Sequence, residues 1–259
     1  MTNEVLILDY KKLLNIVMNI GKEMLVCGAE VSRVEDTITR ICRAYNVEEI
    51  NVFTITSSII TTIKADNEIY TQTKRIFNYN TNLDRLDKLN SLSRHICTNK
   101  PDISYIEKNF ENIKNSKVYS SFFNCFVYGI IAMSLTAYFG GGISDSVVSA
   151  TLGVLMYLLI SKSNYVDANI TFLTMIIAFI IGTAAVIFVK FGFGSNLDSI
   201  VIGNIMLMIP GVAITNSIRD MISGDTMSGL LRFVESIIRA TAVTLGFVLA
   251  TFYLGGIIL

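Results

Sequence analysis

The sequence predicts an α-helical membrane protein, with about five transmembrane helices preceded by a small cytoplasmic α+β domain. Hydrophobic residues make up 52% of the chain and charged residues only 16%, whereas about a quarter of a soluble domain is charged. The charges are also unevenly placed, because residues 1–120 hold 16 of the 21 Lys and Arg and 15 of the 21 Asp and Glu. We therefore expect a polar domain at residues 1–118 and a membrane domain at residues 119–259.

The expected orientation places the N-terminus in the cytoplasm. The chain begins without a basic segment followed by a long apolar core, which predicts that there is no cleavable signal peptide. Lys114 and Lys117 precede the first expected span, and Arg219 and Arg232 lie between the last two, as the positive-inside rule requires. We expect a multi-pass protein of the inner or plasma membrane. The net charge of zero does not indicate nucleic-acid binding.

Two helices begin the polar domain. Tyr10–Met24 carries apolar residues at helical spacing, and Cys27-Gly28 interrupts the pattern before a second helix that starts near Val31. Within that helix, Ser32 and Glu35 have the S-x-x-E spacing of a capping box. The alternative is that acidic and basic residues here contact or gate the membrane domain, and the spacing leaves both interpretations open. The residues of this possible gate are Glu30, Arg33 and Glu35.

Strands and two further helices complete the polar domain. Asn51–Lys64 is rich in Thr, Ile, Val and Phe, which predicts β structure, and Ala65–Glu68 forms a turn into a paired strand at Ile69–Arg75. Leucines at helical spacing predict a helix from Leu83 to about Ile96. A last polar helix is expected after Pro101-Asp102, ending near Lys114.

Apolar runs of membrane-spanning length predict the spans. The final run, from Gly229 to Leu259, would make a helix of roughly 46 Å, too long for a hydrocarbon core of about 30 Å. Its charges divide it, since Arg232, Glu235 and Arg239 share one helical stripe and no charge follows them. Gly229–Arg239 is therefore expected to be an amphipathic approach segment. The five expected spans are Phe122–Phe139, Ser144–Ile160, Ile170–Val189, Ile200–Ile218 and Ala240–Leu259.

The fourth span and the charges after it form the candidate translocation site. Pro210-Gly211 interrupts the span, and broken helices with nearby polar groups build binding sites in transporters. Arginine side chains can bind a carboxylate, whereas acidic side chains can bind an ammonium group or carry a coupling proton. The alternative is that these charges only fix the orientation of the helices. The candidate residues are Asn204, Pro210, Gly211, Asn216, Arg219, Asp220, Asp225, Arg232 and Glu235.

The sequence gives no indication of an enzyme, a metal or a cofactor. It contains no GxSxG, HExxH or P-loop pattern, and the single histidine, His95, cannot form a metal site alone. The four cysteines, which lack CxxC spacing, are expected to be reduced and mostly buried: Cys27, Cys42, Cys97 and Cys125.

Three segments together resemble the threonine/serine exporter family, and specifically its N-terminal half. They read CGAEVSRVEDTITRI, AYFGGGISD and IPGVAITNSIRDMISGDTMSGLLRFVESIIRA, and the resemblance covers almost the whole chain. The most specific parts are the GAExxRVE pattern of the first segment and the pattern of the third segment. The pattern of the third segment falls on Pro210, Gly211, Arg219, Asp220, Gly224, Asp225, Gly229, Arg232 and Glu235.

The resemblance implies a transporter that exports small polar metabolites. Threonine and serine are the substrates of one branch and a dicarboxylate such as succinate that of another, and the proton motive force is the implied energy source. Full-length members join two membrane halves. This chain resembles one of them, so a second small multi-span subunit and an oligomeric assembly are implied. The competing hypothesis is a membrane-tethered sensor or assembly protein that acts through its cytoplasmic domain.

Overall fold

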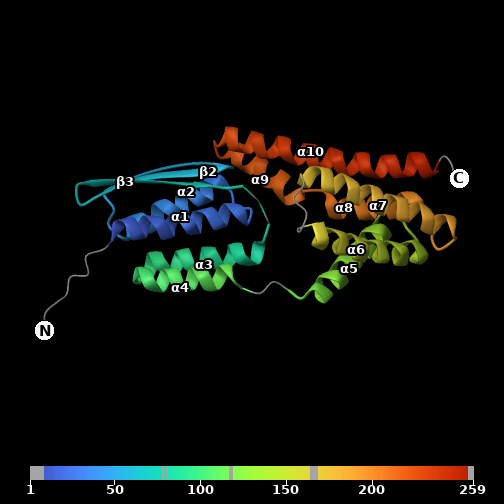
Figure 1. Cartoon of the computed structure of the whole chain (residues 1–259), viewed down its shortest axis with the longest axis horizontal. Coiled ribbons are helices and arrows are strands. Elements are labelled where there is room, and N and C mark those ends of the chain that lie inside the picture. The colour runs from blue at the N-terminus through green and yellow to red at the C-terminus, as the bar shows by residue number, and fades with distance from the viewer. Residues whose placement is uncertain (1–8, 78, 80, 117–118, 164–168, 256–259) are drawn as a thin grey trace. The chain divides into compact units, whose positions relative to one another are not determined.

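The computed structural model describes residues 9–77, 79, 81–116, 119–163 and 169–255, which are drawn in colour in Figure 1. Contacts divide the chain into two compact units. The first comprises Met1–Lys117 with Val212–Phe233, and the second comprises Val118–Gly211 with Val234–Leu259. The first unit, which we also call the polar unit, includes Val212–Phe233, a segment that lies within the expected membrane domain at residues 119–259.

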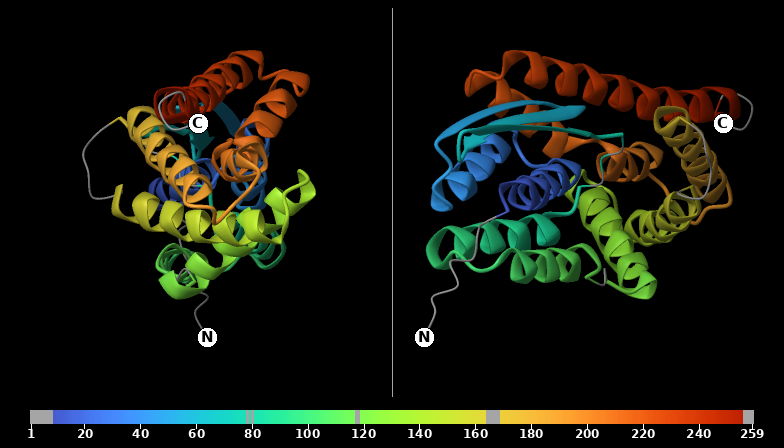
Figure 2. Two further views of the ribbon diagram at one scale, coloured as in Figure 1. Left: turned by 90° about the vertical axis from the view of Figure 1, so that its right-hand side faces the viewer. Right: turned by 60° about the vertical axis from the view of Figure 1, so that its left-hand side comes forward.

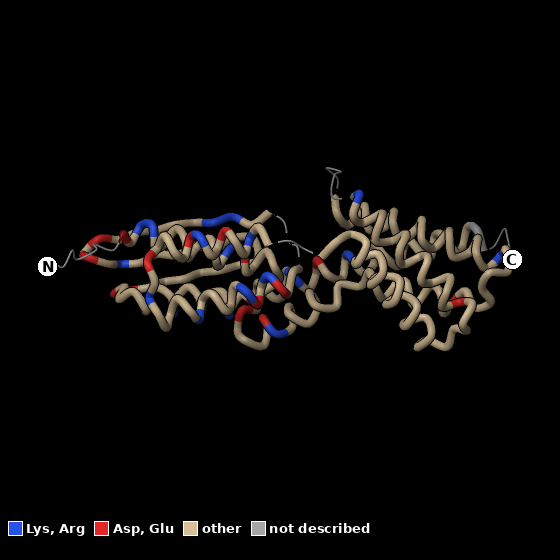
Figure 3. The backbone as a smooth tube through the Cα atoms, turned by 90° about the horizontal axis from the view of Figure 1, so that it is seen from below, with Lys and Arg blue, Asp and Glu red and all other residues tan. Residues whose placement is uncertain are grey.

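The first unit is an α+β layered structure. A three-stranded sheet in the order β1-β2-β3 forms one layer, and α1 and α2 cover one face of it. α3 and α4 form a third layer, in which α3 packs mainly on α2 and α4 packs on α1 (Figures 1 and 2). Figure 3 shows that Lys, Arg, Asp and Glu are frequent throughout this unit. Its elements from the N-terminal part of the chain are α1 (Tyr10–Val26), α2 (Val31–Ala44), β1 (Glu49–Ile55), β2 (Ser58–Ala65), β3 (Glu68–Arg75), α3 (Leu83–Asn99) and α4 (Ile103–Lys114).

The sheet contains one strand more than the sequence analysis expected. The β-rich stretch Asn51–Lys64 is two strands, because a tight turn at residues 56–57 brings Ile55 opposite Ser58. No Gly, Pro, Asn or Asp marks this turn, which is why composition did not reveal it. The second turn is the expected one, and Asp66 and Asn67 both have positive φ there, 52° and 61°, as a type I′ hairpin turn requires.

Alternation along β2 orients the sheet. Ile59, Thr61 and Ile63 are fully buried, whereas Ile60 between them is 39% exposed. The buried residues therefore point to the same side, as the period of two dictates, and α1 and α2 cover that side. The expected apolar face of α2, from Val31 to Ile41, is buried in the same core. Burial raises the pKa of the Cys27 thiol to about 11 and that of Cys42 to about 12, so neither is a reactive thiolate.

The second unit is helical and confirms the predicted fold class. Among the described residues, four helices are long and apolar enough to cross a membrane, and α8 with α9 would make a fifth if the pair forms one span. The first three lie within three residues of the expected spans at either end. They are α5 (Ser121–Tyr138), α6 (Ile143–Ser163) and α7 (Ile170–Lys190).

The expected fourth span, Ile200–Ile218, is two helices rather than one. α8 (Leu197–Met208) ends before the proline and α9 (Gly211–Ile222) begins after it. Ile209 between them is extended, with φ −67° and ψ 128°, because the ring of Pro210 disfavours a helical conformation in the residue before it. The sequence therefore located the break correctly. It did not show that α9 packs with the polar unit, which depends on tertiary contacts.

The last helix does not divide where the change in polarity suggested. α10 (Thr226–Ala250) is continuous and runs into a short π-helical turn, Thr251–Gly255. The expected approach segment Gly229–Arg239 and the start of the expected span Ala240–Leu259 are thus one helix, because loss of charge alone does not interrupt backbone hydrogen bonding. Residues 256–259 of that expected span lie outside the described residues.

Candidate functional site

The first unit brings the loop before α2 against α9 and the start of α10. We call this contact the α2–α9–α10 joint, and define it by the backbone of Gly28–Val31 and the side chains of Glu30, Asn216, Arg219, Asp220 and Arg232. These residues are about 190 positions apart in the sequence. The joint unites five of the twelve residues that the sequence analysis singled out.

A buried ion pair forms the centre of the joint. Asp220 is fully buried, and its Oδ1 accepts a hydrogen bond from the Val31 N–H at 3.0 Å, at the first residue of α2. Arg232 is 8% exposed, and its Nη1 donates to Asp220 Oδ2 at 3.1 Å and to the Ala29 carbonyl at 3.2 Å. A carboxylate is favourable at a helix N-terminus because the free N–H groups there carry partial positive charge. Asp220 thus acts as a helix cap supplied from another helix.

Two further contacts flank the ion pair. Arg219 forms an ion pair with Glu30, and the Asn216 Nδ2 donates to the Gly28 carbonyl at 2.8 Å. Gly28 has φ +95°, a conformation that favours glycine, and this turn directs the chain into α2. The segment GAE before α2 is therefore held through its backbone as well as its side chains.

The capping-box interpretation of Ser32 and Glu35 is wrong. α2 begins at Val31 with Glu30 as the N-cap residue, so Ser32 already lies inside the helix. Glu35 Oε1 instead accepts the Thr54 N–H at 2.7 Å and so links α2 to β1. The position that a cap would occupy is filled by Asp220, which no local pattern could reveal.

Glu35 and Asp225 are two partly buried acids whose charges interact. Burial raises the pKa of Glu35; the hydrogen bond from Thr54 opposes this, and the negative charge of Asp225 adds to it. Burial also raises the pKa of Asp225, which lies in the turn between α9 and α10. Carboxyl groups with raised pKa values take up and release protons closer to neutral pH than ordinary carboxyl groups do.

Replacing Glu35 by glutamine is expected to stabilise the folded protein at pH values above the pKa of Glu35. A raised pKa in the folded state means that the folded state holds this proton more tightly than the unfolded state. The contribution of Glu35 to stability is therefore lost as the pH rises from the ordinary carboxyl range, near about 4, through the raised folded pKa. Glu35→Gln should raise the unfolding temperature at pH 7 and change it little at pH 4.

Thermal unfolding of the purified full chain at several pH values measures this difference. Glu107→Gln provides the control, because it makes the same chemical change at an exposed position on α4. An equal effect of Glu35→Gln at pH 4 and pH 7 would contradict the assignment.

The remaining predicted residues lie outside the joint. Glu235 is exposed on α10, and Pro210 and Gly211 form the break before α9. Arg33 is also exposed, and it lines a separate pocket of about 490 Å³ between α2 and α3. In the part of the chain that the structure describes, no hydrogen bond or ion pair joins Glu235 or Arg33 to Asp220 or Arg232.

Asn204 and Asn216, which the sequence analysis placed in one candidate translocation site, have different partners. Asn204 is fully buried in the second unit, where its Nδ2 donates to Ser149 Oγ at 2.8 Å and to the Ile200 carbonyl at 2.9 Å. Asn216 belongs to the joint in the first unit. The described contacts therefore assign the two amides to separate polar sites.

The sequence analysis missed the partners of Asn204 and an acid that positions α8. Asp145, at the start of α6, accepts from the Ser195 and Asn196 N–H groups at 2.6 and 3.0 Å and fixes the loop before α8. A buried acid in an apolar run is an available signal for such a role. Single Ser and Thr residues, in contrast, are common in membrane helices and give no such signal.

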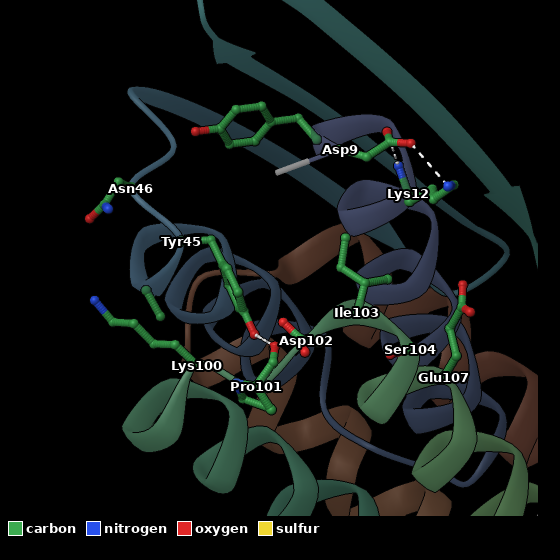
Figure 4. A pocket seen from close by; sticks show the side chains of 12 residues that line it. Asp9, Lys12, Tyr45, Asn46, Lys100, Pro101, Asp102, Ile103, Ser104 and Glu107 are labelled. Carbon is green, nitrogen blue, oxygen red and sulfur yellow. Dashed lines mark hydrogen bonds and ion pairs between the residues drawn. The ribbon is translucent and has the colours of Figure 1, made fainter. Parts of the chain in front are cut away.

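A pocket of about 720 Å³ opens at the opposite end of α2 from the joint (Figure 4). It lies between the start of α1, the end of α2 and the turn from α3 to α4. Figure 4 shows Lys12 paired with Asp9, and the Tyr45 hydroxyl donating to the Pro101 carbonyl at 2.5 Å. None of the predicted site residues lines this pocket.

The family model ThrE, which describes threonine/serine exporters, matches residues 15–254. No curated protein and no solved structure shows significant similarity to the chain.

Proposed function

Because the chain belongs to the threonine/serine exporter family and is a multi-pass membrane protein, we propose that it is one subunit of a secondary transporter. Its substrates are small polar metabolites, with threonine and serine as the first candidates and a dicarboxylate such as succinate as the other branch. The polar unit lies in the cytoplasm, and the N-terminus is cytoplasmic. The proton motive force drives export.

The observation that carries this proposal is the α2–α9–α10 joint. It connects the polar unit to the two helices that follow the break at Pro210, and it does so through buried charges. Transporters use broken helices and helix termini to hold charged groups of their substrates. A membrane anchor for a sensor domain would need neither the break nor a buried ion pair.

The joint supports a role as a cytoplasmic gate. Both candidate carboxylate-binding arginines are already paired with acids, Arg232 with Asp220 and Arg219 with Glu30. A substrate carboxylate can replace these acids only if the contacts exchange, which separates α2 from α9. The gate is therefore closed in this arrangement, and substrate or a proton opens it. Glu35 and Asp225 are the candidate proton carriers because both have raised pKa values.

A second small membrane subunit completes the assembly in this proposal. Only 17% of α5 is buried inside the structure, compared with 39% of the apolar stretch of α6. Lipid or another helical protein can cover such a surface. Because full-length members of the family join two membrane halves, we favour a protein partner over lipid.

The decisive experiment measures release of metabolites from cells that express the full chain together with the second subunit. We expect release of threonine, serine or succinate to require both proteins and to fall when an uncoupler collapses the proton gradient. Expression of either protein alone is the control. Unchanged release in the presence of the uncoupler would contradict proton coupling. If no metabolite is released although both proteins reach the membrane, the sensor hypothesis would replace this one.

A further inference from the structure

Three buried polar side chains meet where α5, α6 and α8 pack together in the second unit. Thr136 on α5, Ser149 on α6 and Asn204 on α8 are each 0% exposed. The Thr136 hydroxyl donates to Ser149 Oγ at 2.7 Å, and Asn204 Nδ2 donates to the same atom at 2.8 Å. We call this group the Thr136–Ser149–Asn204 cluster. It lies among apolar helices, where burying a polar group costs free energy and such groups commonly serve a function.

Every donor in the cluster already has an acceptor. The Ser149 hydroxyl donates to the Ala132 carbonyl at 3.1 Å, and the second Asn204 N–H donates to the Ile200 carbonyl at 2.9 Å. A carbonyl oxygen can only accept, so the amide nitrogen of Asn204 must be the atom that faces Ile200. This bond fixes the orientation of the amide.

What remains unused in the cluster is acceptor capacity. Asn204 Oδ1 is buried and receives no hydrogen bond from the described residues. An amide oxygen has two lone pairs, and the Thr136 oxygen can accept as well as donate. Buried polar atoms are almost always paired. The Asn204 oxygen, unlike an isolated hydroxyl, is held beside two further buried polar side chains, so a donor from outside these residues can complete the cluster. A carboxylate cannot serve, because it is itself an acceptor.

The cluster is also held rigidly. A Cβ atom at Gly203 would lie 2.1 Å from Thr136 Oγ1, so α8 approaches α5 as closely as a glycine permits. Ser199 Oγ donates to the Phe139 carbonyl at 3.0 Å one turn earlier on α8. These contacts, in the turn of α8 that precedes Asn204, help to keep its amide oxygen in place, as a specific binding group requires.

We infer that the Thr136–Ser149–Asn204 cluster is a hydroxyl-recognition subsite, in which Asn204 Oδ1 accepts a hydrogen bond from the side-chain hydroxyl of a small hydroxy amino acid. This inference rests on the proposed export function and assigns to these three residues the selection of a hydroxy amino acid over a dicarboxylate. The three side chains of the cluster are uncharged, which suits a neutral hydroxyl. An ammonium group there would be a buried charge without a counter-ion among them.

The test compares threonine with 2-aminobutyrate, which has the same backbone and lacks the hydroxyl. Both are loaded into cells that express the full chain with its second subunit, and their release rates are measured. We expect the wild type to prefer threonine by at least about tenfold, because a site that binds a hydroxyl discriminates against an analogue without one. Asn204→Leu should bring the ratio of the two rates close to one.

Thr183→Val is the matched control. The Thr183 hydroxyl on α7 is also buried in the second unit without a partner among the described residues, but it lies outside the cluster. This variant should keep the wild-type ratio. The ratio is measured within one variant, so it does not depend on how much protein reaches the membrane.

Two outcomes would overturn the inference. The first is a threonine preference that survives in Asn204→Leu, and the second is a wild type that releases succinate but neither hydroxy amino acid. If Asn204→Leu fails to insert, the ratio of release rates is measured in Thr136→Val instead. This variant removes one hydroxyl of the cluster with almost no change in volume. An unchanged ratio in Thr136→Val would then count against the subsite. Failure of the wild type to release any metabolite would instead refute the proposed function.

Discussion

Replacement of Asp220 by alanine is expected to cost about 3–5 kcal/mol of folding free energy and to abolish export. The change leaves the Arg232 guanidinium buried without its carboxylate, and it removes the group that caps α2 at Val31. A buried charge without its counter-ion is far more costly than a broken surface pair. Thermal unfolding of the purified protein measures the first effect, and metabolite release measures the second.

An exposed ion pair on α2 provides the control for Asp220. Asp36 and Arg40 form a salt bridge with side chains that are 55% and 70% exposed, and such pairs contribute about 0–1 kcal/mol. Asp36→Ala should therefore leave both unfolding and export nearly unchanged. Equal unfolding temperatures for Asp36→Ala and Asp220→Ala would contradict the buried ion pair.

A double variant separates stability from transport. Asp220→Leu with Arg232→Met replaces the ion pair by apolar side chains, which is often neutral for stability. We expect this variant to regain most of the stability lost in Asp220→Ala and to remain unable to export. Restored export would show that the charges serve only to fold the joint, and the gate proposal would then be wrong.

Introduction of a single methyl group at Gly229 is expected to disrupt the packing of α9 against α10. A Cβ atom there would lie 2.5 Å from Met221 Cγ, 2.6 Å from the Ser217 carbonyl and 2.8 Å from the Met221 nitrogen. Two of these three atoms belong to the backbone, so the helices must separate. Overpacking of this kind costs about 1–3 kcal/mol. Gly229→Ala should therefore lower the unfolding temperature and reduce export.

Gly211 offers a matched control in the neighbouring helix. A Cβ atom at Gly211 meets nothing within 4 Å, so Gly211→Ala should change stability by no more than about 0.5 kcal/mol. Both variants make the same chemical change at a glycine of the family pattern. If Gly211→Ala were as disruptive as Gly229→Ala, the effect would not come from the helix contact, and the packing argument would fail.

Local periodicity predicted most of the helices because it depends only on neighbouring residues. Apolar residues at helical spacing located α1, α2 and α3, and long apolar runs located α5, α6 and α7. The proline break after α8 was equally predictable, since the ring acts on the residue directly before it. The turn at residues 56–57 was missed because neither of its residues, Thr56 and Ser57, is a strong turn former.

The candidate site was predictable as a set of residue types but not as an arrangement. Sequence analysis selected Glu30, Arg219, Asp220 and Arg232, yet it could not pair them. For Glu35 it left a local cap and a gate as alternatives, whereas in the structure this residue accepts a hydrogen bond from β1. Charged residues interact with whichever element packs against them. The spacing of residues within a single segment does not predict which element that is.

The sequence by itself determined that this is a helical membrane protein with a polar α+β unit, where its helices break, and which charges follow the break. Composition and period are sufficient for these because they reflect local burial and local backbone geometry. Only the tertiary structure decided that Asp220 caps α2 from 189 residues away, and that Asn204 shares its site with Thr136 and Ser149 rather than with Asn216. The physical reason is the same in both cases. A buried polar group needs a hydrogen-bond partner that is close in space. The residues between the two partners in the sequence do not indicate which partner that is.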